Sequence, residues 1–231
     1  MVTIACVQAR LASSRYPQKA LALLDGHPLI WHVVSRVRQV RGLAAVRLVV
    51  PAADADRLSA ACAGLAVEVW PTQTVPLRTR TDGTVAAWDV LSAYCATAYD
   101  LQAHDWVLRV TGDCPAWRPW VGTGLLALRD HYLAEPSLPR PPWFSADVTC
   151  SGWPDGADAE LVPVALLRAA ASQATWPADR EHVTRWLRRT YPPAILAAPH
   201  DEGHLKLSID EPQDLTTVRQ YLRAVRSCEV A

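Results

Sequence analysis

The sequence predicts an α/β fold with a mainly parallel sheet that is covered by helices on both faces. Two observations predict it. Short apolar runs, typical of buried strands, alternate with segments of helical periodicity, and 231 residues suffice for one sizeable α/β core. A chain of this length is short for two such cores, so we expect a single domain over residues 1–231. The proline-rich segment Pro136–Trp143 is interpreted as a surface excursion from that domain.

The individual elements follow from these patterns in chain order. The apolar run Val2–Val7 predicts a buried strand, and apolar residues at positions 29, 30, 33, 34 and 37 predict the helix that follows. Near the other end, the Asp-Glu-Pro sequence at 210–212 is typical of a helix start. The predicted strands are Val2–Val7, Ala45–Val50, Ala66–Val69, Trp106–Thr111, Ala159–Val162 and His204–Ile209. The predicted helices are Pro28–Val40, Ala53–Gly64, Thr84–Ala98, Trp120–Tyr132, Pro163–Ala171, Glu181–Thr190 and Pro212–Val225.

Composition excludes several classes of protein. The formal net charge is zero with both signs mixed along the chain, so a nucleic acid polymer is not an expected partner. No run approaches the roughly 20 apolar residues of a membrane span, and the chain enters a strand without a charged leader. The six cysteines are scattered without a CxxC pair, as in a protein that keeps its thiols reduced. We therefore expect a cytoplasmic protein that does not bind membranes.

The segment Gln8–Lys19, QARLASSRYPQK, is the most informative part of the chain. It follows the first predicted strand and carries three cations, Arg10, Arg15 and Lys19, among small residues such as Ser13. A loop after a strand, with converging backbone N–H groups and mobile positive charge, is suited to an anion of high charge density. It contains no glycine and is not a GxxxxGK[ST] phosphate loop. A basic surface loop between a strand and a helix is the alternative interpretation.

Six motifs in order resemble one family of enzymes. The first loop is similar to the pattern Q/P-A-R-x-x-S-x-R-x-P-G-K, and five further segments are similar to DVLxRY, RxTGDCP, YPDGxDxE, REHVT and LxxDxPxDL. These segments are Asp89–Tyr94, Arg109–Pro115, Trp153–Glu160, Arg180–Thr184 and Leu207–Leu215. Together they resemble the spore coat polysaccharide biosynthesis cytidylyltransferase-like family, with CMP-Kdo and CMP-sialic acid synthetases as more distant relatives. Gln18 and Ala93 depart from the pattern, where that family has glycine and arginine.

The resemblance implies a fold and an activity. It implies a three-layer, Rossmann-like, mixed but mainly parallel sheet resembling the nucleotide-diphospho-sugar transferase (GT-A-like) fold. It also implies a Mg²⁺-dependent cytidylyltransferase that couples CTP to a small acceptor and releases pyrophosphate. The acceptor would be a sugar acid, a sugar or polyol phosphate, or a phosphonate. A homodimer remains open.

Metal binding is expected at two aspartates. Mg²⁺ prefers oxygen ligands and usually takes one or two protein carboxylates together with phosphates and water. Asp113 follows a predicted strand, Asp210 ends another, and the resemblance implies that both carry the metal. The alternative for each is a cap: Asp113 in the turn before Pro115, and Asp210 at the helix that begins near Pro212.

Nucleotide binding is expected at the first loop and at two later motifs. Arg10 and Lys19 would hold the β- and γ-phosphates, and with Asp113 they form the expected catalytic set. Arg15 either assists them or pairs with a local carboxylate. The expected nucleotide-binding residues are Gln8, Ala9, Arg10, Ser13, Arg15, Lys19, Asp89, Thr111 and Gly112.

Acceptor binding is expected at the later motifs. The candidates are Asp155, Asp158, Glu160, Arg180, Glu181 and His182. Solvated charges on a turn are the alternative for the three carboxylates that come first, and a packing or capping role is the alternative for His182. Trp117, Trp120 and Trp153 flank these motifs and either line a pocket or pack in the core.

Other functions stay open at this point. One is a nucleotidyltransferase that uses GTP or UTP, and another is a noncatalytic nucleotide- or sugar-binding descendant of the family. A glycosyltransferase would need a DxD metal motif. The DxD sequence Asp54-Ala55-Asp56 opens a predicted helix and is interpreted as a cap.

Overall fold

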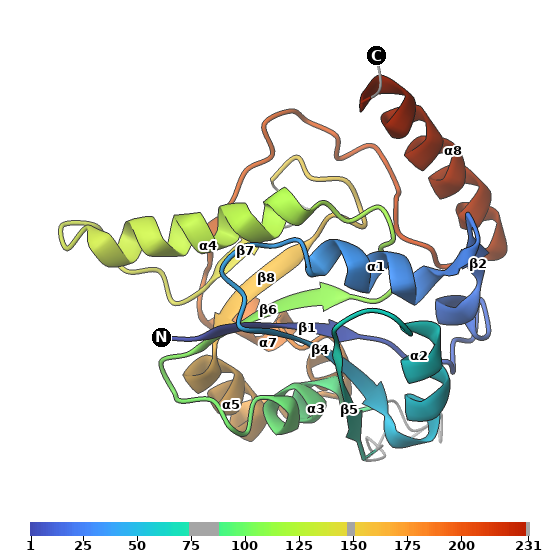
Figure 1. Ribbon diagram of the computed structural model, residues 1–231. Helices are drawn as coiled ribbons and strands as arrows, with labels where there is room; N and C mark the ends of the chain where they lie inside the picture. Colours follow the sequence, from blue (N-terminus) through green and yellow to red (C-terminus); the bar gives the residue numbers. More distant parts are fainter. Residues whose placement is uncertain (74–87, 147–150, 230–231) are drawn as a thin grey trace.

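The computed structural model describes residues 1–73, 88–146 and 151–229 (Figure 1). The remaining residues include the first four of the predicted helix Thr84–Ala98, and Cys150, which lie outside the described part. Within it, Cys6, Cys62, Cys95 and Cys114 are free thiols.

A seven-stranded sheet forms the centre of the described chain, in the order β5-β4-β1-β6-β8-β7-β9. Only β8 runs against its neighbours β6 and β7, and every other adjacent pair is parallel. Two short strands, β2 and β3, pair separately as a hairpin. The strands are β1 Thr3–Gln8, β2 Leu23–Leu24, β3 His27–Pro28, β4 Ala45–Pro51, β5 Glu68–Thr72, β6 Trp106–Thr111, β7 Phe144–Ala146, β8 Ala159–Pro163 and β9 Ala194–Ile195.

Helices cover both faces of the sheet (Figure 1). The α-helices are α1 Leu29–Val37, α2 Ala55–Ala61, α3 Val90–Thr97, α4 Pro119–Ala134, α5 Val164–Gln173, α6 Pro177–Glu181, α7 Arg185–Thr190 and α8 Pro212–Glu229. Two short 3₁₀ helices lie in the loops. The first, η1 Lys19–Leu21, follows β1, and the second, η2 Ala52–Asp54, follows β4. None of the described helices is both long and apolar enough to span a bilayer.

Strand alternation sorts the core into two clusters, one on each face. Ala5 and Val7 of β1 belong to the cluster that contains apolar residues of α1, α2, α4 and α8. Ile4 and Cys6 belong to the cluster that contains apolar residues of α3, α5 and α7. Successive side chains of a strand point to opposite faces, so a strand that is buried on both sides is apolar throughout. The predicted three-layer fold with a mixed, mainly parallel sheet is confirmed.

Two predicted elements are wrong. The segment His204–Ile209 forms no strand in the described chain; it makes a single bridge, between Asp155 and Lys206. The predicted helix Glu181–Thr190 is broken, because α6 ends at Glu181 and α7 begins at Arg185. Val183 lies between them with a φ of 45°, a left-handed conformation that interrupts a helix. The short strands β2, β3, β7 and β9 were not predicted.

Candidate active site

A pocket of about 360 Å³ opens at the carboxyl ends of β1 and β6. Open parallel sheets bind ligands at this edge. It is lined by Gln8, Ala9, Arg10, Ser13, Ser14, Arg15, Lys19, Ala20, Trp88, Val90, Arg109, Thr111, Gly112, Asp113, Glu181, His182 and Asp210. The pocket brings together residues from both ends of the chain.

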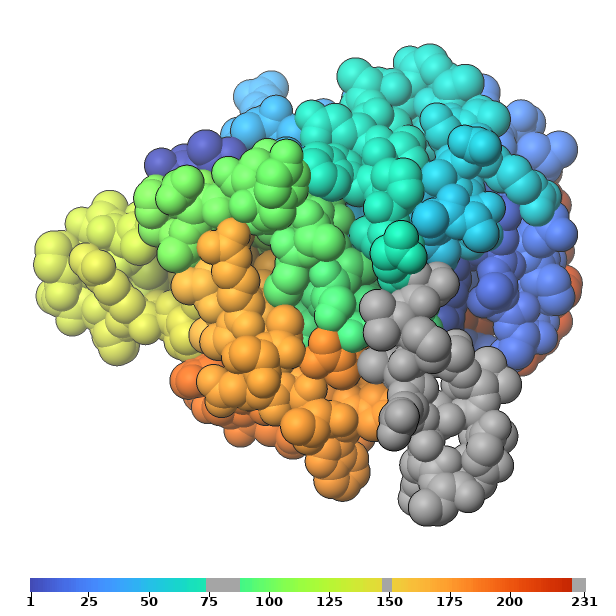
Figure 2. Space-filling view, turned by 90° about the horizontal axis from the view of Figure 1, so that it is seen from below, coloured from blue at the N-terminus to red at the C-terminus, as the bar shows by residue number. Residues whose placement is uncertain are grey.

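Figure 2 views the molecule from the side of α3 (green) and α5 (orange), which pack against each other below the sheet.

The loop after β1 is fixed by backbone contacts to its neighbours. The Ala9 N–H donates to the Val49 carbonyl at 3.0 Å, and the Leu11 N–H donates to Asp54 Oδ2 at 2.8 Å. Asp54 stands at the N-cap position of α2 but makes no side-chain cap, so its carboxylate serves the loop instead. The aspartates of the DxD sequence are absent from the pocket lining among the described residues. Gln18 adopts a φ of 59°, which explains why a glycine suits this position.

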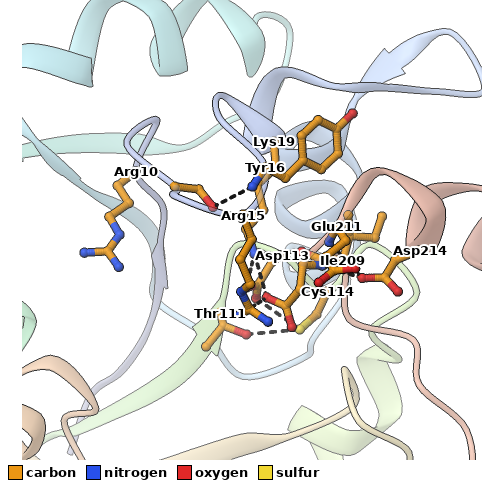
Figure 3. A network of polar contacts seen from close by, with 12 residues as sticks. Arg10, Arg15, Tyr16, Lys19, Thr111, Asp113, Cys114, Ile209, Glu211 and Asp214 are labelled. Carbon is orange, nitrogen blue, oxygen red and sulfur yellow. Dashed lines mark hydrogen bonds and ion pairs between the residues drawn. The ribbon is translucent and has the colours of Figure 1, made fainter.

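Lys19 is the centre of the site (Figure 3). Its Nζ donates to Asp113 Oδ2 at 2.8 Å, to the Ile209 carbonyl at 2.7 Å and to Asp210 Oδ1 at 3.2 Å. Burial disfavours the charge, but the Asp113 and Asp210 carboxylates outweigh it and raise the pKa of Lys19. The ammonium therefore stays charged while it is held among three oxygens.

Asp113 reaches the pocket from the turn after β6. Gly112 precedes it, and a Cβ at this glycine would lie 2.5 Å from the Gln8 carbonyl, so the close approach of the two strand ends requires glycine. Burial pushes the pKa of Asp113 upward, but the Lys19 ammonium and the hydrogen bonds from Thr111 and Cys114 hold it below its ordinary value. The carboxylate is thus ionised at the floor of the pocket.

Asp210 faces the same cation, and its side chain is not the helix cap. At the start of α8, the N–H groups of Asp210 and Glu211 donate to Asp214 Oδ2 at 2.8 and 2.9 Å. The Asp210 side chain instead contacts Lys19 and accepts from Arg15 Nη2 at 2.9 Å. A backbone bond from Ile209 N–H to the Asp113 carbonyl, at 2.9 Å, ties this segment to the turn after β6. The two predicted metal-binding aspartates therefore converge.

The donor set around Lys19 fits a hard cation. It consists of carboxylate and carbonyl oxygens, with two aspartates at its centre. Within the described residues there is no group of three or more His, Cys, Asp or Glu side chains that could enclose a metal. Mg²⁺ usually takes one or two protein carboxylates and completes its coordination with phosphate oxygens and water. Asp113 and Asp210 suit that mode of binding.

Arg10 lies apart from this cluster. In Figure 3 its side chain extends away from Lys19 and Asp113, on the opposite side of the loop. Its Nη2 lies 2.9 Å from Glu181 Oε1 at the end of α6, which makes an ion pair between two pocket-lining segments. Arg10 therefore connects the first loop to the segment that contains Glu181 and His182. His182 is exposed and lines the pocket.

Two predicted residues pair with each other outside the pocket lining. Asp89 caps α3, where Oδ1 accepts from the Ser92 N–H at 3.0 Å. Arg180 Nε donates to Asp89 Oδ2 at 2.8 Å and the guanidinium also binds the carbonyls of Ala171 and Ala174. The pair joins α3 to α6, and any contact of either residue with a substrate stays a prediction.

The three carboxylates of the fourth motif also lie outside the pocket lining. Glu160 is buried in β8 and its Oε2 accepts from Arg109 Nη1 at 2.8 Å. Asp158 accepts from the Gly156 N–H at 3.0 Å, and burial with the nearby charge of Glu160 raises its pKa to about 6. Asp155 bridges to Lys206 through its backbone. Their predicted role in acceptor binding stays a prediction.

Sequence reasoning missed several pocket residues. Ala20, Trp88 and Arg109 line the cavity but were not assigned to it. Arg109 stands inside a recognised motif, which is the signal that could have found it. Conversely, Trp117 and Trp153 are fully buried, Trp120 is exposed and packs against Trp153, and these three line no part of the pocket. Trp117 and Trp153 belong to the core beside α4.

Known proteins with similar sequences are cytidylyltransferases. A family model described as cytidylyltransferase matches residues 4–119, a little over half of the chain. A 3-deoxy-manno-octulosonate cytidylyltransferase of Leptothrix cholodnii is 39% identical over 126 residues, which cover 53% of this chain and 42% of that protein. An 8-amino-3,8-dideoxy-manno-octulosonate cytidylyltransferase of Shewanella sediminis is 34% identical over 129 residues, covering 56% and 48%. The chain spans about half the length of the curated relatives it matches.

Solved structures share the fold. A cytidylyltransferase from Leptospira borgpetersenii superposes with a TM-score of 0.75 over 95% of this chain and 85% of that one, at 18% identity. A CMP:2-keto-3-deoxy-manno-octonic acid synthetase complexed with CTP gives a TM-score of 0.63 over 97% and 99%, also at 18% identity. At this identity the likeness concerns the fold. The match over residues 4–119 shows that the chain belongs to the cytidylyltransferase family.

Proposed function

We propose that this protein is a Mg²⁺-dependent nucleotidyltransferase that transfers CMP from CTP to a small acceptor and releases pyrophosphate. The observation that carries the proposal is the position of Lys19, whose Nζ lies between the carboxylates of Asp113 and Asp210 at the edge of the sheet. Two carboxylates and a cation that meet at a pocket floor suit a metal–triphosphate complex.

The reaction requires stabilisation of the charge that develops on the phosphate oxygens and alignment of the reacting atoms. An acceptor oxygen forms a bond to the α-phosphorus while the bond from that phosphorus to the bridging oxygen of the β-phosphate breaks, and pyrophosphate leaves. Lys19 and Arg15 would hold the phosphates from the side of Asp210, and Arg10 would approach from the side of Glu181. Asp113 and Asp210 would hold Mg²⁺, which neutralises the charge that builds on the phosphate oxygens.

The acceptor would enter beside Glu181 and His182, the predicted acceptor residues that line the pocket. The family match ends at residue 119, before this part of the chain, so it does not describe the acceptor side. The names of the relatives make eight-carbon sugar acids the first acceptors to try. Sugar or polyol phosphates and phosphonates are the next class.

The test is pyrophosphate release from CTP and Mg²⁺ across an acceptor panel, with Asp113→Asn and Asp210→Asn as variants and Asp201→Asn as control. Asp201 is an exposed carboxylate away from the pocket lining. We expect release with CTP and at least one acceptor, lost in both site variants and kept in the control. Release with UTP or GTP instead of CTP would support the alternative base. Triphosphate binding without release across the panel would support a noncatalytic descendant.

A further inference from the structure

We propose that Gln8, held in place by the buried ion pair of Arg109 with Glu160, reads the nucleobase and selects cytosine over uracil. This inference rests on the proposed function, since it assumes that a pyrimidine nucleoside triphosphate enters the pocket. It adds the residue that would set base preference.

The pocket has two chemically different sides. The triphosphate side contains Arg15, Lys19, Asp113 and Asp210, which form one network. The other side lies on the α3 face of the sheet. Cys6 of β1 and Val107 of β6 pack in the core cluster of that face, so alternation places the side chains of Gln8 and Arg109 there too. Trp88 and Val90, which line the pocket at the start of α3, belong to the same cluster.

The amide of Gln8 has a fixed orientation. Arg109 Nε donates to Gln8 Oε1 at 3.2 Å, which occupies the acceptor of the amide. Within the described chain, the amide nitrogen of Gln8 has no hydrogen-bond acceptor, so its donors are left for a ligand.

Arg109 is itself held in place by an ion pair with Glu160. Its Nη1 lies 2.8 Å from Glu160 Oε2, and both side chains are almost fully buried. Glu160 Oε1 accepts from Thr184 Oγ1 at 3.1 Å and from Arg188 Nη2 at 3.0 Å. A buried ion pair costs desolvation and is a weak source of stability. It does restrict Arg109 to one position, and Arg109 in turn fixes which end of the Gln8 amide faces the cavity.

A second donor lies on the same side. Trp88 is 5% exposed and lines the pocket, and its indole Nε1 has no hydrogen-bond partner among the described residues. A buried donor without a partner costs free energy, so such groups commonly await a ligand or water. The Trp88 nitrogen is buried, so the Gln8 amide is the donor that this wall of the pocket presents to a ligand.

Donors distinguish the two pyrimidines. Cytosine presents two adjacent acceptors, O2 and N3, whereas uracil carries a hydrogen on N3 and therefore presents a donor at that position. A donor on Gln8 would pair with N3 of cytosine and oppose N3–H of uracil. Sites that hydrogen-bond a substrate atom reject analogues that lack it, because the protein group is then left unpaired.

The test pairs variants with nucleotide analogues. Binding of CTP, UTP and 3-deaza-CTP, in which carbon replaces N3, is measured by calorimetry with Mg²⁺ for the wild type, Gln8→Leu and Gln8→Glu. Gln39→Leu is the control, because Gln39 is an exposed glutamine whose amide binds the Ser35 carbonyl on α1. Thermal unfolding without nucleotide checks that each variant is folded, and Gln8→Glu keeps an acceptor for Arg109.

We expect the wild type and the control to bind CTP roughly 10- to 100-fold more tightly than UTP or 3-deaza-CTP. In Gln8→Leu, the affinities for CTP, UTP and 3-deaza-CTP should lie within about threefold of one another. Gln8→Glu should bind UTP more tightly than CTP, because a carboxylate accepts a hydrogen bond from N3–H. Arg109→Lys, which retains a charge for Glu160, should lower the ratio of CTP to 3-deaza-CTP affinity. The control Arg118→Lys should not, because Arg118 pairs with Glu202 and is not part of the pocket lining.

Two results would overturn the inference. One is equal affinity of the wild type for CTP and 3-deaza-CTP, and the other is an unchanged ratio in folded Gln8→Leu. Both leave triphosphate binding and pyrophosphate release untouched, so the proposed function would survive them. Absence of triphosphate binding in the wild type would instead remove the proposed function and this inference together.

Discussion

Lys19 Nζ lies 2.8 Å from Asp113 Oδ2, although the two residues are 94 positions apart in the chain. The contact joins the loop after β1 to the turn after β6, and Asp210 joins it from the start of α8. Parallel neighbours bring these loops to one edge of the sheet. The site is therefore a consequence of strand order.

Removing the Lys19 charge should abolish most activity. We expect Lys19→Met to lower pyrophosphate release by about 10²- to 10³-fold, because one preorganised cation facing the developing charge is lost. The apo protein should also be less stable, since Asp113 would lose its ion-pair partner while Asp210 would keep Arg15. Release assays and urea unfolding measure the two effects.

Lys206→Met is the matched control for this change. Lys206 also approaches Asp210, at 3.8 Å, but it lies at the surface and bonds mainly to Asp214. Its loss should change release by less than about threefold, because exposed ion pairs contribute little. Equal losses in the two variants would contradict the central place given to Lys19.

Asp158 should make stability fall as the pH rises. Its pKa is raised to about 6 in the folded protein, so the folded state binds this proton more tightly than the unfolded state. The stabilisation from the protonated form is complete below about pH 4 and is lost as the pH rises through about 6. Above that pH, Asp158→Asn should raise the free energy of unfolding by roughly 2 kcal/mol.

Urea unfolding between pH 4.5 and 7.5 checks this prediction. The control is Asp201→Asn, because the Asp201 carboxylate likewise accepts from a glycine N–H, that of Gly203 at 3.0 Å, but is exposed. The wild type and the control should lose stability over this range, and Asp158→Asn should lose less. Parallel curves for all three proteins would show that Asp158 does not titrate near pH 6.

A glycine at position 18 should relieve the strain of the left-handed backbone conformation that Gln18 adopts. Residues with a side chain pay roughly 1 kcal/mol in this conformation, whereas glycine adopts it freely but loses more entropy on folding. We expect Gln18→Gly to be neutral or stabilising by up to about 1 kcal/mol, and Gln18→Val to be destabilising. Gln18→Ala controls for the lost bond from Arg57 to Gln18 Oε1. A Gly variant less stable than the Ala variant would contradict the argument.

Glu181 should compete with the nucleotide for Arg10. The Arg10–Glu181 ion pair spans the pocket-lining loop and the end of α6, and its partners are 38% and 32% exposed. Glu181→Gln should free Arg10 for phosphate and tighten CTP binding by up to about fivefold. Calorimetry measures the change, with Glu135→Gln as an exposed control away from the pocket lining. Weaker binding in Glu181→Gln would mean that Glu181 itself contacts the substrate.

Long, regular elements could be predicted from the sequence, and short ones could not. The strand Trp106–Thr111 was predicted at both ends, because four of its six residues are apolar and buried, and only Arg109 and Thr111 interrupt that pattern. The segment 204–209 also alternates like a strand, but it finds one bridge partner in the described chain, Asp155. β2 and β9 span two residues each, too few to carry a periodic signal.

The site was predictable where its residues stand inside the recognised motifs. Arg10, Lys19, Asp113 and Asp210 all line the pocket, as their positions in the motifs imply. Arg180 was assigned to the acceptor, but the structure pairs it with Asp89, a contact between residues 91 positions apart that no local pattern encodes. Burial of charged groups in such pairs depends on tertiary contacts, which a single sequence does not reveal.

The most direct test of the account is calorimetric titration of CTP into the wild type, Asp113→Asn and Asp210→Asn, each with and without Mg²⁺. It requires no knowledge of the acceptor. The wild type should bind CTP much more tightly with Mg²⁺, and each substitution should remove most of this gain. CTP affinity that is independent of Mg²⁺, or unchanged in both variants, would contradict the assignment of Asp113 and Asp210 as the residues that hold the metal beside the triphosphate.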